Sequence, residues 1–234
     1  MFKVAWFARF PQGMAKADAR RHWAEIHGPM CQRVPGIERY VQNHVIGALP
    51  TVSGTSDEAA LFDGYSCGWW PDRAAYEASM ETPEWAKLVD DGDNVFDMAW
   101  LSNMSAQVEE HPMIEGPTTP YKVVWIVRFK EGMSRADARR HWREVHGPIF
   151  KSLDIDRYVQ NHVVGTIAAD VGGESEIEVG FDGFSECWFK DEGQLLRAIQ
   201  SSTWAKAVED GYNVFDMTNL WGARLQERIV KGRP

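Results

Sequence analysis

The 234-residue chain has few cysteines and no long hydrophobic run, and both absences narrow its class. Its three cysteines, Cys31, Cys67 and Cys187, form no Cys-x-x-Cys pair, which argues against zinc knuckles and structural disulfides. No segment approaches the roughly 20 apolar residues that a membrane-spanning helix needs. The first residues also lack the pattern of a signal peptide. We therefore expect a cytoplasmic protein with no membrane partner.

Basic charge is scarce as well. The chain has 25 Lys and Arg against 34 Asp and Glu, a formal net charge of −9, and nucleic-acid binding depends on clustered Lys and Arg. Neither a Gly-x-Gly-x-x-Gly fingerprint nor a phosphate loop is present, and on an α-helix the five-residue spacing of His22 and His27 separates the imidazoles by about 140°. We expect no nucleic-acid partner, no metal and no cofactor.

The sequence contains an internal repeat. Residues 17–23 return as 136–142, residues 40–45 as 158–163, and residues 94–98 as 213–217. The offset is 119 residues, or 118 in the second block. A period this long indicates a duplicated domain, because solenoid repeats run about 20–50 residues. We predict one repeat over residues 1–110, a Pro-rich linker over 111–120 and a second repeat over 121–234.

Each repeat carries the same order of predicted elements. In the first repeat we predict strands over 4–10, 37–49, 62–70 and 98–108, and helices from residue 15 and over 72–80 and 83–91. Pro29 and Pro148 are expected to end or bend the first helix of each repeat. Residues 51–60 and the Gly172-Gly173 segment are expected to be loops.

This β-α-β-β-α-β order is that of the ferredoxin-like plan, in which helices cover one face of a sheet. The bare faces of two such sheets can pack against each other. We therefore predict an α+β fold in which two ferredoxin-like repeats form an intramolecular pseudo-dimer with a cavity in each half. Further homo-oligomerisation stays open.

Several repeated motifs mark a family resemblance. They are Gly13-Met14, Arg20 to Trp23, His27-Gly28-Pro29, the strand 39–44, Asp63-Gly64 and Phe96-Asp97. In these motifs the chain resembles the EthD-type family of the dimeric α+β barrel superfamily. The resemblance implies a tandem barrel that works without metal or organic cofactor on small hydrophobic, oxygenated molecules. Relatives look like methylmuconolactone isomerases, fungal polyketide decarboxylases and dehydratases, and an accessory protein of a cytochrome P450 ether-degradation system.

The resemblance also implies catalytic positions. The isomerase relatives use a His on the first helix, a Tyr at the start of the second strand and a Cys on the third strand. Carried over, these roles fall on His27, Tyr40 and Cys67, and in the second half on His146, Tyr158 and Glu186. The two pockets are therefore expected to differ chemically.

The residues themselves support the two histidines. His27 and His146 each follow a Trp by four residues, so each imidazole shares the apolar stripe that faces the sheet. A partly buried imidazole stays neutral near physiological pH and can take a proton next to a carbonyl. The alternative is a buried His that only hydrogen-bonds a backbone carbonyl.

Polar residues gather on one face of the second strand in each repeat. They are Tyr40, Gln42 and His44, with Tyr158, Gln160 and His162 as counterparts. In a dry pocket they would hydrogen-bond an enolate, a phenolate or a carboxylate. The alternative is a satisfied polar ladder.

The remaining candidates lie on and before the third strand. Cys67 is either a nucleophile or a small hydrophobe, and Glu186 must be paired or face a pocket. For Trp69 and Trp188 we expect a structural role in the core, with contact to the substrate as the alternative. Asp63 and Asp182 precede Gly, so both a turn-forming role and a substrate-binding role remain open.

These observations predict a cofactor-independent lyase or isomerase acting on a small hydrophobic compound, aromatic or lactone, by proton abstraction and enolate or phenolate stabilisation. Decarboxylation, dehydration and lactone isomerisation all fit. Two alternatives remain. One is a non-catalytic accessory protein that carries such a compound for an oxygenase in a catabolic pathway, and the other is a haem-binding barrel.

Overall fold

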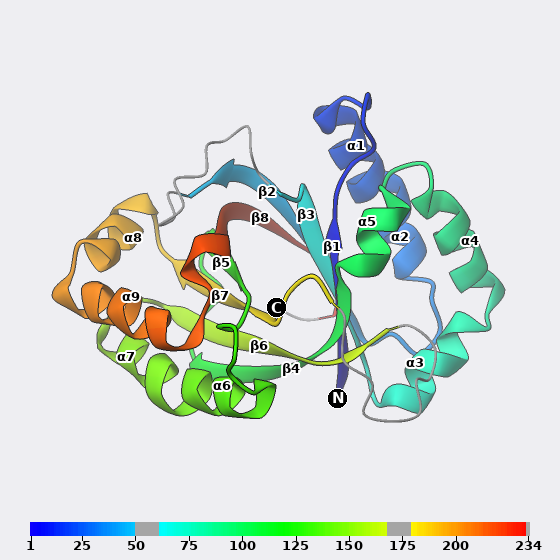
Figure 1. Ribbon diagram of the computed structural model, residues 1–234. Helices are drawn as coiled ribbons and strands as arrows, with labels where there is room; N and C mark the ends of the chain where they lie inside the picture. The colour runs from blue at the N-terminus through cyan, green and yellow to red at the C-terminus, as the bar shows by residue number, and fades with distance from the viewer. Residues whose placement is uncertain (50–60, 168–178, 233–234) are drawn as a thin grey trace.

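The computed structural model describes residues 1–49, 61–167 and 179–232, and at its centre eight antiparallel strands close into a barrel (Figure 1). The helices of the first half lie on one side of the barrel and those of the second half on the opposite side. The α+β class and the duplicated architecture expected from the sequence are confirmed. The predicted loops over 51–60 and at Gly172-Gly173 lie outside the described residues.

The first half forms ten elements within its described residues. They are β1 (Phe2–Ala8), α1 (Lys16–His22), the π-helical segment η1 (Trp23–His27), α2 (Gly28–Cys31), β2 (Arg39–Ala48), β3 (Gly64–Trp70), α3 (Arg73–Met80), α4 (Pro83–Gly92), α5 (Met98–Asn103) and β4 (Ser105–Ile114).

The second half repeats this order with small changes. Its elements are β5 (Tyr121–Val127), α6 (Arg135–His141), the π-helical segment η3 (Trp142–His146), α7 (Gly147–Ile149), the 3-10 turn η4 (Phe150–Ser152), β6 (Arg157–Thr166), β7 (Gly183–Phe189), α8 (Glu192–Ile199), α9 (Ser202–Val214), the 3-10 turn η5 (Met217–Asn219) and β8 (Trp221–Lys231).

The two halves are joined by shared strand pairs. The order around the barrel is β1-β3-β2-β8-β5-β7-β6-β4. Strand β8 of the second half pairs with β2, and β4 of the first half pairs with β6. The last strand of each half therefore hydrogen-bonds to the other half.

Two predicted boundaries are wrong around β4. Residues 98–103 form helix α5 instead of a strand, because the Asp97 carboxylate accepts a hydrogen bond from the Trp100 backbone N–H at 3.1 Å and caps the helix. Strand β4 then runs through Ile114, which pairs with Tyr158 of β6. Residues 111–114, placed in the linker by composition, thus belong to the barrel.

The first helix of each repeat does not end at its proline. Pro29 lies in the first turn of α2, where a missing backbone N–H is tolerated, and the helix continues to Cys31. The preceding five residues form a π-helical turn, in which the Gly28 N–H bonds the Trp23 carbonyl. The second half has the same turn over Trp142–His146.

Close contact between this helix and the sheet depends on glycine. A Cβ atom at Gly28 would lie 2.7 Å from the Gln42 side-chain nitrogen, and one at Gly64 would lie 2.6 Å from the Trp23 ring. Gly147 and Gly183 make the same approaches in the second half. The repeated His-Gly-Pro and Asp-Gly motifs therefore set how closely helix and strands pack.

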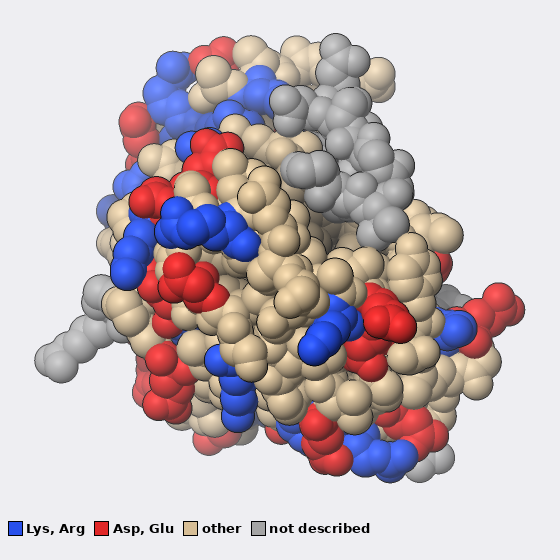
Figure 2. Space-filling view, turned by 90° about the vertical axis from the view of Figure 1, so that its left-hand side faces the viewer, with Lys and Arg blue, Asp and Glu red and all other residues tan. Residues whose placement is uncertain are grey.

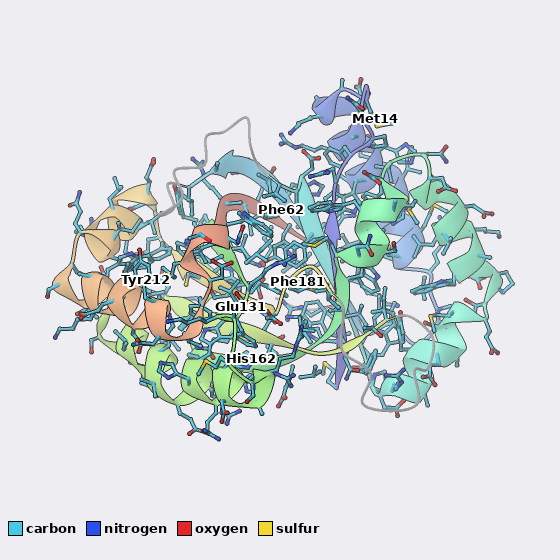
Figure 3. All side chains as sticks on the ribbon, in the orientation of Figure 1. Met14, Phe62, Glu131, His162, Phe181 and Tyr212 are labelled. Atoms are coloured by element: carbon cyan, nitrogen blue, oxygen red, sulfur yellow. The ribbon has the colours of Figure 1, made fainter. Side chains whose placement is uncertain are left out.

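The barrel interior is filled by side chains. The ring of Phe7 contacts Phe62, Phe181 and Phe184 at centroid distances of 5.4, 4.9 and 5.2 Å. Figure 3 shows Phe62 and Phe181 in the central region of the molecule. The expectation that the facing sheets enclose the cavities is therefore wrong, because aromatic side chains occupy that space. The cavities lined by His27 and His146 lie outside the barrel, between strands and helices.

The surface carries both signs of charge. Figure 2 shows the face that lies at the left of Figure 1, where Lys and Arg side chains are interspersed with Asp and Glu. None of the helices in the described parts of the chain has the length and apolar character to cross a membrane.

Candidate functional site

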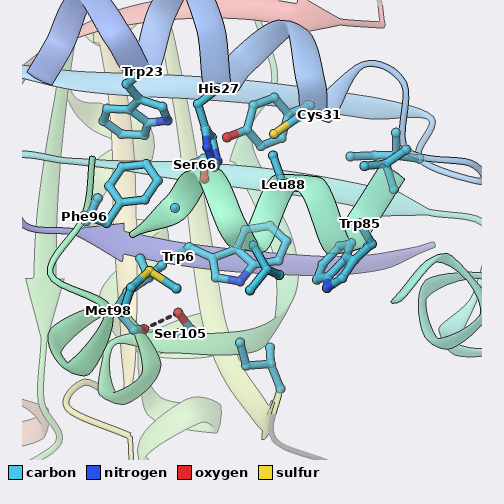
Figure 4. Close-up of a pocket in the computed structure, with 18 of the residues that line it drawn as sticks. Trp6, Trp23, His27, Cys31, Ser66, Trp85, Leu88, Phe96, Met98 and Ser105 are labelled. Atoms are coloured by element: carbon cyan, nitrogen blue, oxygen red, sulfur yellow. Dashed lines mark hydrogen bonds between the residues drawn. The ribbon is translucent and has the colours of Figure 1, made fainter. Parts of the chain in front are cut away.

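An apolar cavity of the first half lies between its helices and the outer face of its strands. Its volume is about 240 Å³. Large apolar side chains line most of it, among them Trp6, Trp85 and Phe96, and a few polar groups converge on it, including His27 and Tyr40 (Figure 4). Apolar walls with a few placed polar groups are typical of a small-molecule site.

His27 is held by a carboxylate from another helix. Its Nδ1 lies 2.9 Å from Oδ2 of Asp91 on α4, while His22 Nε2 lies 2.9 Å from Oδ1 of the same residue. The expected 140° separation of these two imidazoles is wrong, because the π-helical turn places residues five apart on one face. The second half repeats the arrangement with His141, His146 and Asp210.

This arrangement fixes the orientation and the charge state of the His27 imidazole. Because Nδ1 bonds Asp91, Nε2 is the nitrogen available to the cavity, and Figure 4 shows the imidazole directed toward Ser66. Burial lowers the pKa of His27 despite the opposing effect of Asp91. Burial also opposes ionisation of Asp91, but its hydrogen bonds to His22 and His27 lower its pKa. A neutral imidazole beside a carboxylate results.

Two hydrogen-bond donors lie close to His27. Burial raises the pKa of Tyr40 well above its usual value, so its hydroxyl keeps its proton, and that hydroxyl is within hydrogen-bonding reach of Ser66, Cys31 and the Trp23 indole. The indole Nε1–H of Trp23 is buried, and it forms no hydrogen bond of normal geometry within the described residues. Figure 4 shows the nitrogen-bearing edge of that ring facing His27.

The other polar residues of β2 and β6 do not line the cavities. Gln42 donates to the Trp23 carbonyl at 2.8 Å, and Gln160 donates to the Trp142 carbonyl at 2.9 Å. His44 packs against the Trp23 ring at 4.4 Å and is not among the residues that line the cavity. Burial lowers its pKa to about 4.

His162 repeats the position of His44. Its ring stacks on Trp142 at 4.3 Å, and its Nε2 lies 3.0 Å from Gln160 Oε1. Burial lowers its pKa to about 3. Of the polar residues expected on one face of the second strand, only the tyrosine lines the cavity in either half. Gln42, His44 and their counterparts instead hydrogen-bond or stack within the protein, as in the polar ladder given as the alternative.

Asp63 and Asp182 brace the turn after the first strand of each half. Asp63 accepts a hydrogen bond from the Phe10 N–H at 2.8 Å and pairs with Lys16 at 2.9 Å. Asp182 accepts from the Phe129 N–H at 2.8 Å and pairs with Arg135 at 2.9 Å. Neither residue lines the cavity that holds His27 or the one that holds His146.

Glu186 lies inside the barrel, away from His146. One of its oxygens lies 2.6 Å from Lys122 Nζ and accepts from the Tyr65 hydroxyl at 2.6 Å, and the other accepts from Asn161 at 3.0 Å and lies 3.9 Å from Lys3 Nζ. Burial opposes ionisation, but Lys122 and Lys3 hold the pKa of Glu186 well below its usual range. The structure thus pairs this carboxylate and does not bring it to Tyr158 and His162.

Glu186, Lys3 and Lys122 form an ion cluster inside the barrel, and the other three barrel-facing candidates lie around it. Burial raises the pKa of Cys67 to about 12, which keeps the thiol protonated. Trp69 lies 4.6 Å from Lys3 Nζ and Trp188 lies 4.4 Å from Lys122 Nζ. Cys67, Trp69 and Trp188 therefore face the opposite side of the sheet from His27 and His146.

The cavity of the second half is smaller, about 70 Å³. It brings together His146 and Tyr158, as His27 and Tyr40 are brought together in the first half. Phe150 also lines it and stacks on Tyr158.

Asp91 and Asp210 were not among the residues selected from the sequence. Both precede a repeated glycine, in Asp91-Gly92 and Asp210-Gly211, just before the repeated block at 94–98 and 213–217. The repeat was a signal for them, but their contact with the histidines depends on packing between α4 or α9 and the π-helical turn. Within the described residues, no group of three or more His, Cys, Asp or Glu side chains is arranged to hold a metal ion.

Comparison with known proteins supports the duplicated architecture. The model of the EthD domain matches residues 11–99 and again residues 130–218. An anthrone oxidase-like protein has a similar structure, with a TM-score of 0.63 and 10% identity over 98% of this chain and 92% of that chain. None of the curated proteins matches the sequence.

Two bacterial structures are similar at comparable identity. A proposed monooxygenase of Fusobacterium nucleatum gives a TM-score of 0.57 and 10% identity, covering 98% of this chain and 92% of that chain. One from Lactobacillus acidophilus gives 0.50 and 11%, covering 97% and 92%. At such identity these likenesses support the fold and carry no activity across.

Proposed function

The chain belongs to the EthD domain family and carries the domain twice, and from this premise we propose that its first half is a cofactor-independent lyase or isomerase site. The proposed ligand is a small hydrophobic, oxygenated compound, aromatic or lactone. We also propose that each half is a ferredoxin-like repeat, since both halves place their strands in the order fourth, first, third, second.

The observation that carries the proposal is the His27–Asp91 pair beside an apolar cavity. The 2.9 Å contact directs Nδ1 toward the carboxylate, and about 240 Å³ of space lies on the other side of the ring. A positioned imidazole of this kind contributes roughly 10²- to 10⁴-fold to a proton transfer.

In the proposed reaction, His27 Nε2 removes a proton from a carbon next to a carbonyl. The electron pair of that C–H bond forms the C=C bond of an enolate, and the carbonyl π electrons move to oxygen. The Tyr40 hydroxyl and the Trp23 N–H supply hydrogen bonds to that oxygen, and Asp91 stabilises the imidazolium.

The enolate then has two outcomes. The imidazolium returns its proton to another carbon, which is an isomerisation. Alternatively, a β-hydroxyl leaves as water after accepting the proton from His27, which is a dehydration. Both outcomes leave the enzyme in its starting protonation state.

Deuterium exchange tests the first step even where the final product is not identified. The wild-type protein is incubated in D₂O with a panel of aryl ketones and unsaturated lactones, and incorporation at the acidic carbon is followed by NMR. We expect catalysed exchange for at least one member of the panel. His27→Gln should abolish it, and the matched variant His146→Gln should retain it.

Exchange that survives in His27→Gln would overturn the proposed base. If a panel member binds the wild-type protein but no panel member undergoes deuterium exchange, the result would favour the alternative function, an accessory protein that carries the compound.

A further inference from the structure

We propose that the ligand of the first cavity has a planar aromatic ring, an inference that rests on the proposed function. The ring would occupy the position that the Phe150 side chain occupies in the second half. The duplication supplies an internal template: the second half fills with its own side chain the space that the first half leaves open.

Cys31 and Phe150 are equivalent positions. They end the repeated runs His27-Gly28-Pro29-Met30-Cys31 and His146-Gly147-Pro148-Ile149-Phe150, with the same 119-residue offset as the histidines. Both residues are buried and both line the cavity of their half. A small thiol in one copy thus stands where the other copy has a phenyl ring.

The Phe150 ring has specific neighbours. It stacks on Tyr158 with a centroid distance of 4.5 Å and an interplanar angle of 29°, and it meets Trp204 edge-on at 5.7 Å and 65°. It lies 5.3 Å from the His146 ring. Stacked and edge-to-face contacts at these distances are favourable for aromatic rings.

The counterparts of these three neighbours all line the first cavity. They are Tyr40, Trp85 and His27. A free aromatic ring in the Phe150 position would therefore stack on Tyr40, meet Trp85 edge-on and place its substituents beside His27. The same constellation that holds a phenyl side chain in one half is available to a ligand in the other.

The volumes are consistent with this exchange. The first cavity is larger by about 170 Å³, although Ala207 in the second half replaces the bulkier Leu88. Phe150 in place of Cys31, together with Val127 in place of Ala8, therefore outweighs an opposing substitution. Since a dry cavity of about 150 Å³ holds benzene, the first cavity suits one ring with small substituents.

Isothermal titration calorimetry with phenol, and with cyclohexanol as the non-planar control, measures the occupancy directly. Wild type should bind one phenol per chain and bind cyclohexanol at least about tenfold more weakly. Cys31→Phe should bind none, Phe150→Cys should bind two, and the double exchange should bind one.

A second measurement needs no variant. In the wild-type protein, NMR should show magnetisation transfer from bound phenol to the ring protons of Tyr40 and His27. Phenol binding that survives in Cys31→Phe, equal affinity for cyclohexanol, or transfer to other residues only would each overturn the inference.

These outcomes are separate from the proposed chemistry. The predicted stoichiometries without any deuterium exchange would leave the aromatic site standing and refute the enzyme. Exchange with a lactone in a protein that does not bind phenol would do the reverse.

Discussion

Replacing His162 by Phe should make the protein less sensitive to acid. His162 is fully buried, with its ring stacked on Trp142 at 5° and 4.3 Å, and the His111 ring lies 4.6 Å away. Burial, together with the nearby His111, Arg139 and Arg143, lowers the pKa of His162 to about 3. Phe keeps the stacked ring and removes the titrating group.

The sign follows from proton binding. In the unfolded chain a histidine has a pKa near 6.5, so below that pH the unfolded state takes up a proton that native His162 refuses. The stability linked to His162 is complete above about pH 6.5 and is lost as the pH falls toward 3. Between about pH 8 and pH 5, one such group lowers the free energy of unfolding by about 2 kcal/mol.

Urea unfolding followed by tryptophan fluorescence near pH 8 and pH 5 measures this loss. His44, with its pKa lowered to about 4, should contribute a similar amount, so wild type should lose about 4 kcal/mol from these two residues. His162→Phe and the matched variant His44→Phe should each lose about 2 kcal/mol less than wild type. An unchanged loss in His162→Phe would mean that the native ring is protonated, which would refute the assigned burial.

Three further predictions concern other parts of the fold. Asp91→Asn should change the tautomer of His27, as measured by ¹⁵N NMR, and should slow deuterium exchange by about tenfold or more. The affinity for phenol should stay within about twofold of the wild-type value. An unchanged tautomer would contradict the role of the carboxylate. Gly28→Ala should lower the free energy of unfolding by about 1–3 kcal/mol, because its Cβ would lie 2.7 Å from a buried amide, whereas Gly47→Ala, with its nearest contact at 4.0 Å, should change it by less than about 0.5 kcal/mol. Glu186→Gln should destabilise the protein in urea by about 2 kcal/mol, since it removes the carboxylate that both buried lysines contact and leaves Lys3 with Glu110 and Lys122 with Glu227, and it should leave phenol binding unchanged; a neutral effect on unfolding would refute that pairing.

Much of the architecture could be predicted because the repeat samples each element twice. Hydrophobic periodicity located most of the helices and strands. The strand predicted over 98–108 was wrong because local apolar content does not distinguish a short capped helix from a strand. Asp97, one residue before this segment, favours the helix because its carboxylate accepts a hydrogen bond from the Trp100 backbone N–H.

The site was only partly predictable. His27 and Tyr40 line one cavity, but it lies in the layer between helices and sheet and not between the facing sheets. The face occupied by Glu186 was not recognised, because alternation along a strand separates residues into two sets without indicating which set faces the ligand. α-Helical spacing does not predict the π-helical turn, and it places His22 and His27 too far apart to share the contact with Asp91.

The ion cluster inside the barrel bears on how this molecule relates to a dimer of identical subunits. Lys3 and Lys122 are equivalent positions, and each has a carboxylate of its own, Glu110 and Glu227. Among the described residues, Glu186 is the one carboxylate that lies within 4 Å of both lysines, and its own equivalent is the uncharged Cys67. Two copies of the first half would leave that place without an acid, and two copies of the second half would crowd a pair of acids into it. Fusion into one polypeptide guarantees that each acid-bearing copy meets an acid-free one, so the duplicated halves have become complementary parts that are no longer interchangeable.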